Sequence, residues 1–184
     1  MQREELKQYL HEFLQLDQFR DYAPNGLQVE GKAEIRKIVT GVTACQALID
    51  RAVEASADAL LVHHGFFWKN EPEVLTGMKR RRIKTLLLND INLFGYHLPL
   101  DAHPMLGNNA ELGRVLGVIE PEAVETVAQG LLWQGVLDSP MTAKDLSAML
   151  EQCLGQVPLH LDGGDRSIQK LAWCTGGAQD YIDA

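Results

Sequence analysis

The sequence predicts an α/β protein built around mixed or parallel sheet, and three observations support this prediction. Apolar segments of strand length alternate with segments whose apolar residues recur at helical spacing, as in βαβ units. The uninterrupted apolar segment 59–62 is typical of a central strand that is buried on both faces. A segment of sixteen residues also recurs later in the chain, as a duplicated α/β half would.

The first elements follow from residue spacing and turn signals. The residues at 6, 9, 10, 13 and 14 share one helical face, so the chain opens with an amphipathic helix. Pro24-Asn25-Gly26 marks a turn. The elements expected next are a strand at 38–42, a helix at 45–55, the strand at 59–62, a helix that ends at 85–89, a strand at 91–96, and a helix from Asn108 or Asn109 to Val115.

The region after residue 117 has a different pattern. It contains a candidate strand at 131–137 and a helix at 143–154, and it is interrupted by Pro140, Gly155 and Pro158. We interpret it as a small α+β insertion lobe. The predicted organisation is a first α/β half at 1–117, the insertion at 118–167 and the start of a second half at 168–184.

The repeat relates 35–50 to 168–183 without a gap, at an offset of 133 residues, with five identical positions. Each copy reads as a strand, a turn of small residues and the start of a helix. Chance similarity between two βα units is the alternative. The second copy stops where its helix begins, so we expect the second half to be incomplete and the chain to be a truncated form of a longer protein.

Composition limits the classes of function. No apolar segment approaches the roughly 20 residues that a membrane-spanning helix needs, and the charged N-terminus lacks the pattern of a secretory signal. Three widely spaced cysteines suit a reducing compartment, so we expect a cytoplasmic protein. A net charge of −8 argues against nucleic acid as the main ligand.

A basic segment, Lys79-Arg80-Arg81-Arg82 with Lys84 beyond it, departs from this acidic balance. One interpretation is a solvated helix face, which is the common role of such segments. The other is a local docking site for an anionic ligand. The sequence does not decide between them.

Histidines follow the buried strand at 59–62. His63 and His64 come at its carboxyl end, where ligands gather in open α/β sheets. Neighbouring strand residues point to opposite faces, so the backbone must turn before both imidazoles can serve one site. The alternative is one core histidine bonded to a backbone carbonyl and one solvated histidine.

A second cluster favours a metal site over that alternative. His97, Asp101 and His103 follow the strand at 91–96, which ends at the same edge of the predicted sheet. Imidazole and carboxylate together suit zinc, manganese, iron, cobalt or nickel. Asp101 is in addition a candidate to bridge two ions roughly 3.5–4 Å apart. His11 and His160 receive no role.

Four motifs resemble a known family. They are Asp21-Tyr-Ala-Pro-Asn-Gly-Leu-Gln-Val-Glu-Gly31, Val62-His-His-Gly65, His97-Leu-Pro-Leu-Asp-Ala-His103 and Gly107-Asn-Asn109. Together they are similar to the GTP cyclohydrolase 1 type 2 homologs, also called Nif-three-like proteins, and most of all to the bacterial YbgI-like branch. The resemblance is dense from about residue 21 to 117 and returns at 168–183.

The resemblance implies a duplicated Nif-three-like α/β fold with two divalent transition-metal ions per full-length subunit. It carries His63, His64 and Asp101 over as metal ligands, and it places His97 nearby, behind the ligands and without direct contact to the metals. The family's further ligands, a His and a Glu in a C-terminal motif, have no counterpart here. The resemblance also implies a toroidal homohexamer.

The sequence is compatible with two functions. The first is a metal-dependent hydrolase of GTP cyclohydrolase type, acting on a nucleotide or another phosphate-containing small molecule, with His97 or His103 as candidates to transfer protons. The second is a non-catalytic protein that handles metal or forms a metal-stabilised scaffold. Both need the same ligands, so the sequence does not separate them.

Overall fold

Two separate sheets organise the chain, one in the unit Met1–Leu100 and one in the unit that begins at Asp101. The computed structural model describes residues 1–183.

The first unit is built on a four-stranded mixed sheet. Its strand order is β1-β4-β3-β2. The three neighbours β4, β3 and β2 run parallel, and β1 pairs antiparallel with β4 at the edge. The bounds are Gly26–Val29 for β1, Ile38–Thr43 for β2, Ala59–His64 for β3 and Asn92–Gly95 for β4.

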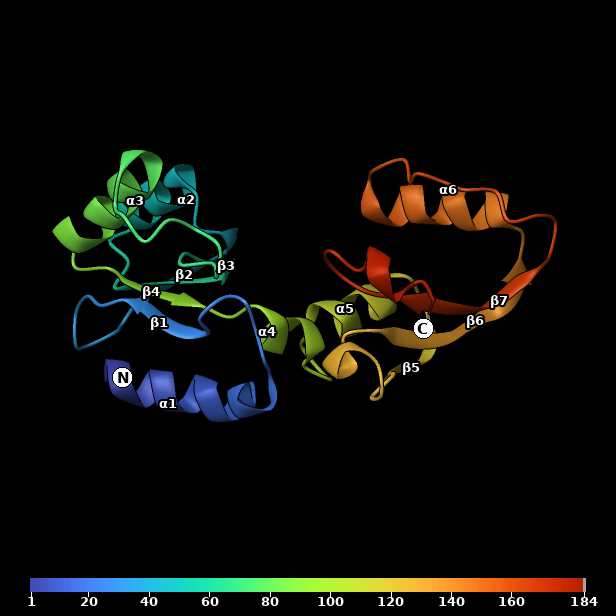
Figure 1. The fold of residues 1–184 in the computed structure, drawn as a ribbon, viewed down its shortest axis with the longest axis horizontal. Coiled ribbons are helices and arrows are strands. Elements are labelled where there is room, and N and C mark those ends of the chain that lie inside the picture. Colours follow the sequence, from blue (N-terminus) through green and yellow to red (C-terminus); the bar gives the residue numbers. More distant parts are fainter. Residues whose placement is uncertain (184) are drawn as a thin grey trace. The chain divides into compact units, whose positions relative to one another are not determined.

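Helices cover both faces of this sheet (Figure 1). Helix α1 (Arg3–Phe13) lies on one face, and α2 (Gln46–Glu54) and α3 (Gly77–Leu88) lie on the other. Successive residues of β3 alternate between the two cores: Leu60 packs in the cluster with α2 and α3, and Ala59 packs in the cluster with α1. This two-sided burial explains why 59–62 is apolar without a break.

The basic segment lies on α3. Lys79 forms an ion pair with Glu71 (3.2 Å) and its ammonium lies 4.9 Å from the centre of the Phe67 ring. Arg81 and Lys84 are exposed. Lys79 therefore has a structural role, whereas Arg81 and Lys84 are solvated. The exposed cations remain compatible with a solvated helix face and with a docking site for an anionic ligand.

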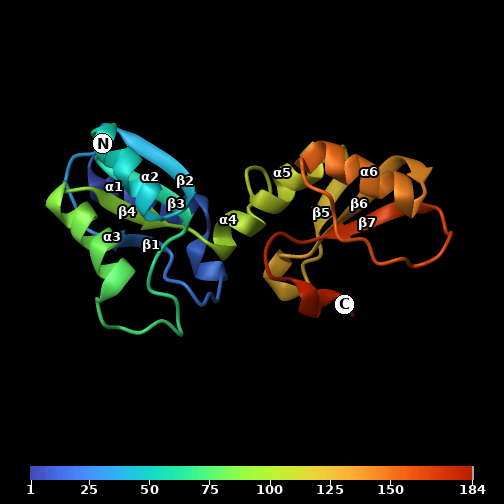
Figure 2. The ribbon, with the colours of Figure 1, turned by 90° about the horizontal axis from the view of Figure 1, so that it is seen from above.

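The second unit holds a three-stranded antiparallel sheet of order β5-β6-β7. Figure 2 follows the chain through α5, β5, β6, α6 and β7. The helices are α5 (Asn108–Val115) and α6 (Ala143–Leu154), and a short helix α4 (Leu98–Ala102) spans the junction of the units. The strands are β5 (Ile119–Ala123), β6 (Trp133–Met141) and β7 (Ile168–Trp173).

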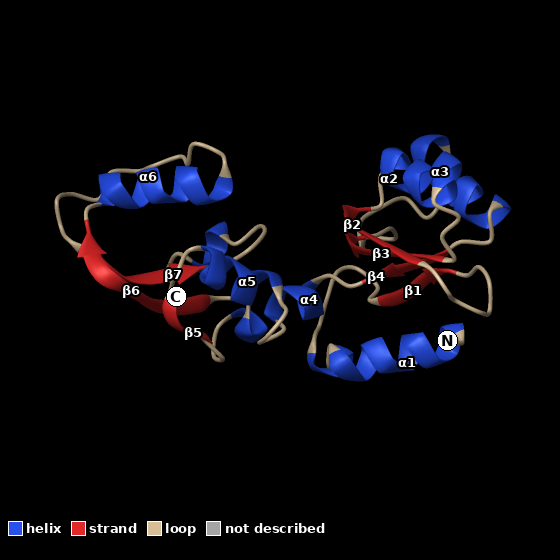
Figure 3. Cartoon of the chain, turned by 180° about the vertical axis from the view of Figure 1, so that it is seen from behind, coloured by secondary structure: helices blue, strands red, loops and turns tan. Residues whose placement is uncertain are grey.

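The predicted α/β class is confirmed, with a mixed sheet in the first unit and helices beside each sheet (Figure 3). Helix 143–154 has the predicted bounds. Strand β3 runs two residues past the predicted end and includes both histidines. Strand β6 starts two residues late and runs past Pro140, and the register of the β6–β7 pair shifts between Val136 and Met141.

Among the strands and α-helices, two strands and one helix were missed. Strand β1 follows the Pro24-Asn25-Gly26 turn directly and is only four residues long. Strand β5 contains Pro121 and two glutamates, which hide it from a pattern search, but as an edge strand it tolerates the proline. Helix α4 is a single turn.

The two copies of the repeat share the strand and differ afterwards. The first copy forms β2 and α2, whereas the second forms β7 and then a 3-10 helix, Gln179–Tyr181. β2 pairs in parallel with β3, and β7 pairs antiparallel with β6. The duplication, and with it the division into 1–117, 118–167 and 168–184, stays a prediction. The compact units divide at Leu100/Asp101.

Among the described residues, no helix combines the length and the apolar character needed to cross a membrane.

Candidate metal centre

Three imidazoles meet at the carboxyl edge of the first sheet. His63 and His64 end β3, and His97 follows β4, its parallel neighbour, after one intervening residue. One ring nitrogen of each lies within 4.8 Å of those of the other two. The ring centroids are 4.4 Å apart for His63 and His64, 5.1 Å for His63 and His97, and 5.7 Å for His64 and His97.

Hydrogen bonds fix two of these rings from the sheet itself. Nδ1 of His63 lies 3.0 Å from the carbonyl oxygen of Tyr96. A carbonyl only accepts, so Nδ1 carries the proton and Nε2 carries the lone pair that suits a metal. Nδ1 of His64 lies 3.2 Å from Oγ1 of Thr43, which is its register partner on β2.

A bond to a backbone carbonyl was also the mark expected of a purely structural histidine. The arrangement of the other rings distinguishes the two interpretations. A structural histidine requires one such bond, whereas here three imidazoles from two strand ends approach one another. The geometry therefore favours a ligand cluster.

His97 is the most buried of the three, at 7% exposure, and a carboxylate orients it. Its Nδ1 lies 3.0 Å from Oδ1 of Asp21. Burial by itself raises the pKa of the Asp21 carboxyl. Hydrogen bonds donated by His97, Asn25 and the backbone of Leu98 and Ala23 outweigh burial and lower the pKa to about 2. Asp21 is thus an anion at neutral pH and accepts the Nδ1 proton of His97, so Nε2 is the ring nitrogen that remains to face a metal.

Two aromatic side chains border His97. The Tyr22 and Trp68 rings meet it edge to face, at 5.1 and 5.0 Å between centroids. Trp68 also lies 5.8 Å from the His64 ring. These rings cover part of the His97 imidazole, and apolar groups around a metal site control its solvent access and local dielectric.

Gln28 ties the surrounding loops together. Its Oε1 accepts from the backbone N–H of Phe66 (2.7 Å), and its Nε2 donates to the carbonyl of Pro24 (2.7 Å). The carboxamide occupies the space beside Gly65, where an added Cβ would lie 2.1 Å from Oε1. A side chain at the position after His63-His64 would therefore have to displace the Gln28 carboxamide.

Asp101 lies in the second unit, where it is 4% exposed. Its Oδ1 accepts from the side chains of Asn108 (2.7 Å) and Thr175 (3.2 Å). His103, also in that unit, accepts at Nδ1 from the backbone N–H groups of Met105 and Leu106. The assignment of Asp101 as a ligand stays a prediction.

The donors of the first unit fit a divalent transition metal. Neutral imidazole suits zinc, copper, iron and nickel, and an orienting carboxylate behind a ligand histidine is a common feature of such sites. The family resemblance placed His97 near the metals without naming it a ligand, and in the structure its ring lies beside those of His63 and His64.

Sequence reasoning gave no role to Asp21, Tyr22, Gln28 or Trp68. Asp21 is 76 residues from His97, so their pairing depends on the tertiary fold. The available signal was the dense motif 21–31, which held Asp21 and Gln28 without showing what they contact.

Comparisons with known proteins agree with this architecture. The family model of Duf34/NIF3 (NGG1p interacting factor 3) matches residues 1–184. A GTP cyclohydrolase 1 type 2 homolog of Escherichia coli K12 is 53% identical over 185 residues, which cover 100% of this chain and 73% of that protein. A protein of the same description from Vibrio cholerae is 52% identical over 181 residues, covering 97% of this chain and 72% of its own length.

Solved structures give the same result. The chain matches a structure described as protein ybgI, of unknown function, with a TM-score of 0.93, 53% identity, and coverage of 100% of this chain and 73% of that one. The protein TTHA1606 from Thermus thermophilus matches with a TM-score of 0.87 and 34% identity, over 100% of this chain and 74% of that one. The resemblance inferred from the sequence motifs is confirmed, and this chain belongs to the DUF34/NIF3 family.

Proposed function

We propose that His63, His64 and His97 hold a divalent transition-metal ion, and that the metal serves hydrolysis of a nucleotide or another phosphate-containing small molecule. The observation that carries the metal is the approach of the three imidazoles to within 4.8 Å of one another, with Asp21 orienting His97. The nucleotide is suggested by the relatives, which are described as GTP cyclohydrolase 1 type 2 homologs.

Residues of this chain would orient the ligands and limit the access of solvent. When bound, the metal supplies a Lewis acid and an activated water. His63 is held by the Tyr96 carbonyl and His64 contacts Thr43, so both rings are oriented before any ligand arrives. Tyr22 and Trp68 limit the access of bulk water on the side of His97.

Three finer points rest on the family resemblance and are proposed on that basis. They are a second metal ion, Asp101 as a further ligand, and assembly of the full-length protein as a homohexamer. Asp101 is buried, and Asn108 and Thr175 hold its carboxylate in one orientation. A fixed orientation is what a metal-ligating carboxylate needs.

A second candidate is metal handling without catalysis. His63 and His64 are only partly buried, so a metal bound there can exchange with solvent more readily than one in a closed site. Slow exchange favours the hydrolase, and fast exchange without turnover favours metal handling.

The test measures metal content and affinity for the purified chain and for the single alanine variants of His63, His64, His97 and Asp101. His11→Ala is the matched control, because His11 is a partly exposed histidine of the same unit that pairs with Asp17. We expect the cluster variants to lose metal and the control to retain it. Equal metal content in all of them would overturn the proposal.

Hydrolysis is tested with a panel of nucleotides and the metal that the protein retains. Turnover that is lost together with metal in the His64→Ala and Asp101→Ala variants supports the hydrolase. Full metal occupancy without turnover of any nucleotide favours metal handling.

A further inference from the structure

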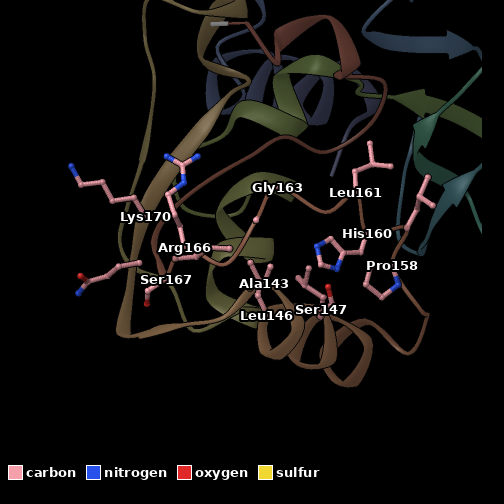
Figure 4. A pocket seen from close by; sticks show the side chains of 15 residues that line it. Ala143, Leu146, Ser147, Pro158, His160, Leu161, Gly163, Arg166, Ser167 and Lys170 are labelled. Atoms are coloured by element: carbon pink, nitrogen blue, oxygen red, sulfur yellow. The ribbon is translucent and has the colours of Figure 1, made fainter.

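The second unit contains a cavity of about 710 Å³ between α6 and the segment 158–170 (Figure 4). Its volume falls within the roughly 300–1,000 Å³ of small-molecule sites. It is lined only by residues of the second unit, so it is separate from the histidine cluster and does not depend on the proposed metal.

The floor of the cavity is apolar. Leu146 and Leu150 lie one turn apart on α6, and Ile168 begins β7 on the opposite side. No described residue of α6 is fully buried, although the helix is amphipathic and twelve residues long. Protein interiors are normally close-packed, so an apolar helix face left beside a cavity of this size can gain free energy by covering it.

The charged residues of the lining have one sign. They are Arg166 and Lys170, and none of the lining residues is Asp or Glu. His160 also borders the cavity. This contrasts with the chain as a whole, whose net charge is −8. Within residues 1–183, neither Arg166 nor Lys170 takes part in any ion pair that the structure records.

The two long cations occupy one margin of the cavity and His160 the other (Figure 4). Lys170 extends outward in this view. Exposed side chains change rotamer within nanoseconds, so both cations can reach an anion at that margin. A guanidinium binds a carboxylate through charge-assisted hydrogen bonds.

We propose that this cavity binds a small amphipathic carboxylate, with its aliphatic part against Leu146, Leu150 and Ile168 and its carboxylate at Arg166 and Lys170. The apolar floor alone would accept a neutral ligand or a second copy of the chain. The all-cationic margin and the small-molecule volume favour a monomeric anion.

The probe is decanoate, titrated below its micelle concentration into the whole chain by calorimetry, with decanol as its neutral counterpart. We expect saturable binding of decanoate that Arg166→Glu weakens by about tenfold or more. Lys144→Glu makes the same charge change on the exposed side of α6, outside the cavity lining, and should alter the affinity less than twofold. Leu150→Gln, at a partly exposed position, should weaken both ligands.

Several results would overturn the proposal. They are the absence of saturable binding, equal losses in the Arg166→Glu and Lys144→Glu variants, and equal affinity for decanoate and decanol. Light scattering measures the oligomeric state of the chain. A self-associated chain that Leu150→Gln makes monomeric, and that binds no decanoate, would assign this face to a second copy.

Discussion

The carboxylate of Asp21 accepts the Nδ1 proton of His97 across 76 residues of sequence, at 3.0 Å, with both side chains almost fully buried. Oδ2 of Asp21 also accepts from the backbone N–H of Leu98 and from the side chain of Asn25. One carboxylate therefore fixes the loop before β1, the start of α4 and the orientation of an imidazole in the candidate metal centre.

The first prediction concerns Asp21→Asn. An asparagine amide has one acceptor oxygen and one NH₂ group. In the variant the NH₂ group would lie against N–H donors that contact the carboxylate of the parent. The side chain must then shift, so His97 loses its fixed orientation. Because outer-shell partners of metal-binding histidines are worth 10–100-fold in metal affinity, we expect a loss of about tenfold or more for Zn²⁺ or Co²⁺. Competition titration against a chromophoric chelator measures it.

Asp17→Asn is the control, because Asp17 is an exposed aspartate of the same unit that contacts His11 and none of the three clustered histidines. Equal affinities for the Asp21→Asn and Asp17→Asn proteins would show that Asp21 does not position the site.

The second prediction concerns Gly65→Ala. The new Cβ would meet the Gln28 carboxamide and force it away from Phe66 and Pro24. Overpacking and lost hydrogen bonds together should lower the free energy of unfolding by about 1–3 kcal/mol. Urea denaturation of the Gly65→Ala protein, and of the Gln28→Ala and double variants described next, provides the measurement.

A double-mutant cycle with Gln28→Ala separates this cause from others. Without the carboxamide, Gly65→Ala has less to displace, so its cost should fall by about 0.5 kcal/mol or more. Strict additivity of the two changes would mean that Gln28 is not what requires the glycine.

The sequence predicted the parts of the site that depend on local pattern. The alternation of strands and helices placed His63, His64 and His97 at neighbouring strand ends, because parallel strands share one carboxyl edge. The orientation of the rings could not be predicted, since it depends on rotamers and, for His97, on a hydrogen bond to Asp21. Strands β1 and β5 were missed because a four-residue strand after a turn, and an edge strand with proline and glutamate, carry little periodicity.

The third prediction concerns Asp58 and acid stability. Lys32 contacts Oδ1 at 2.8 Å, and the backbone N–H groups of Arg36 and Lys37 donate to Oδ2. The Lys32 hydrogen bond, followed by those from the backbone, lowers the pKa of Asp58 to about 2. The ionised form thus stabilises the native state. Its contribution is present above an unfolded-state pKa of about 3.9 and disappears as pH falls through about 2.

We expect Asp58→Asn to remove about 1–2 kcal/mol of this contribution at neutral pH, a value reduced by solvent screening because Lys32 is half exposed. Stability of the variant should fall less steeply than that of the parent between pH 4 and 2. Asp50→Asn is the control, since Asp50 takes part in no ion pair that the structure records within residues 1–183. Parallel pH profiles for parent and Asp58→Asn would contradict the assignment.

The fourth prediction concerns Asn109, the fully buried side chain of α5. Its Nδ2 donates to the carbonyls of Asp101 (3.2 Å) and Leu131 (3.1 Å), and its Oδ1 accepts from the N–H of Thr175 (2.8 Å). Three chain segments of the second unit meet on this one amide. Its backbone carbonyl also accepts from the Trp173 indole, which brings in β7.

Asn109→Leu keeps the approximate volume of the side chain and removes all three of its hydrogen bonds. An N–H and two carbonyls then remain buried without this partner, at about 1–3 kcal/mol for each group that water does not reach. We expect a loss of about 3 kcal/mol or more in the stability of the second unit, and movement of Asp101 because its carbonyl loses the Asn109 amide.

Asn89→Leu is the control, since Asn89 is exposed and its side chain bonds only one turn back on α3, to the Thr85 carbonyl. Hydrogen exchange at the Thr175 amide provides a local measurement beside global denaturation. Protection of that amide unchanged in Asn109→Leu would show that the buried amide does not hold β7 to α5.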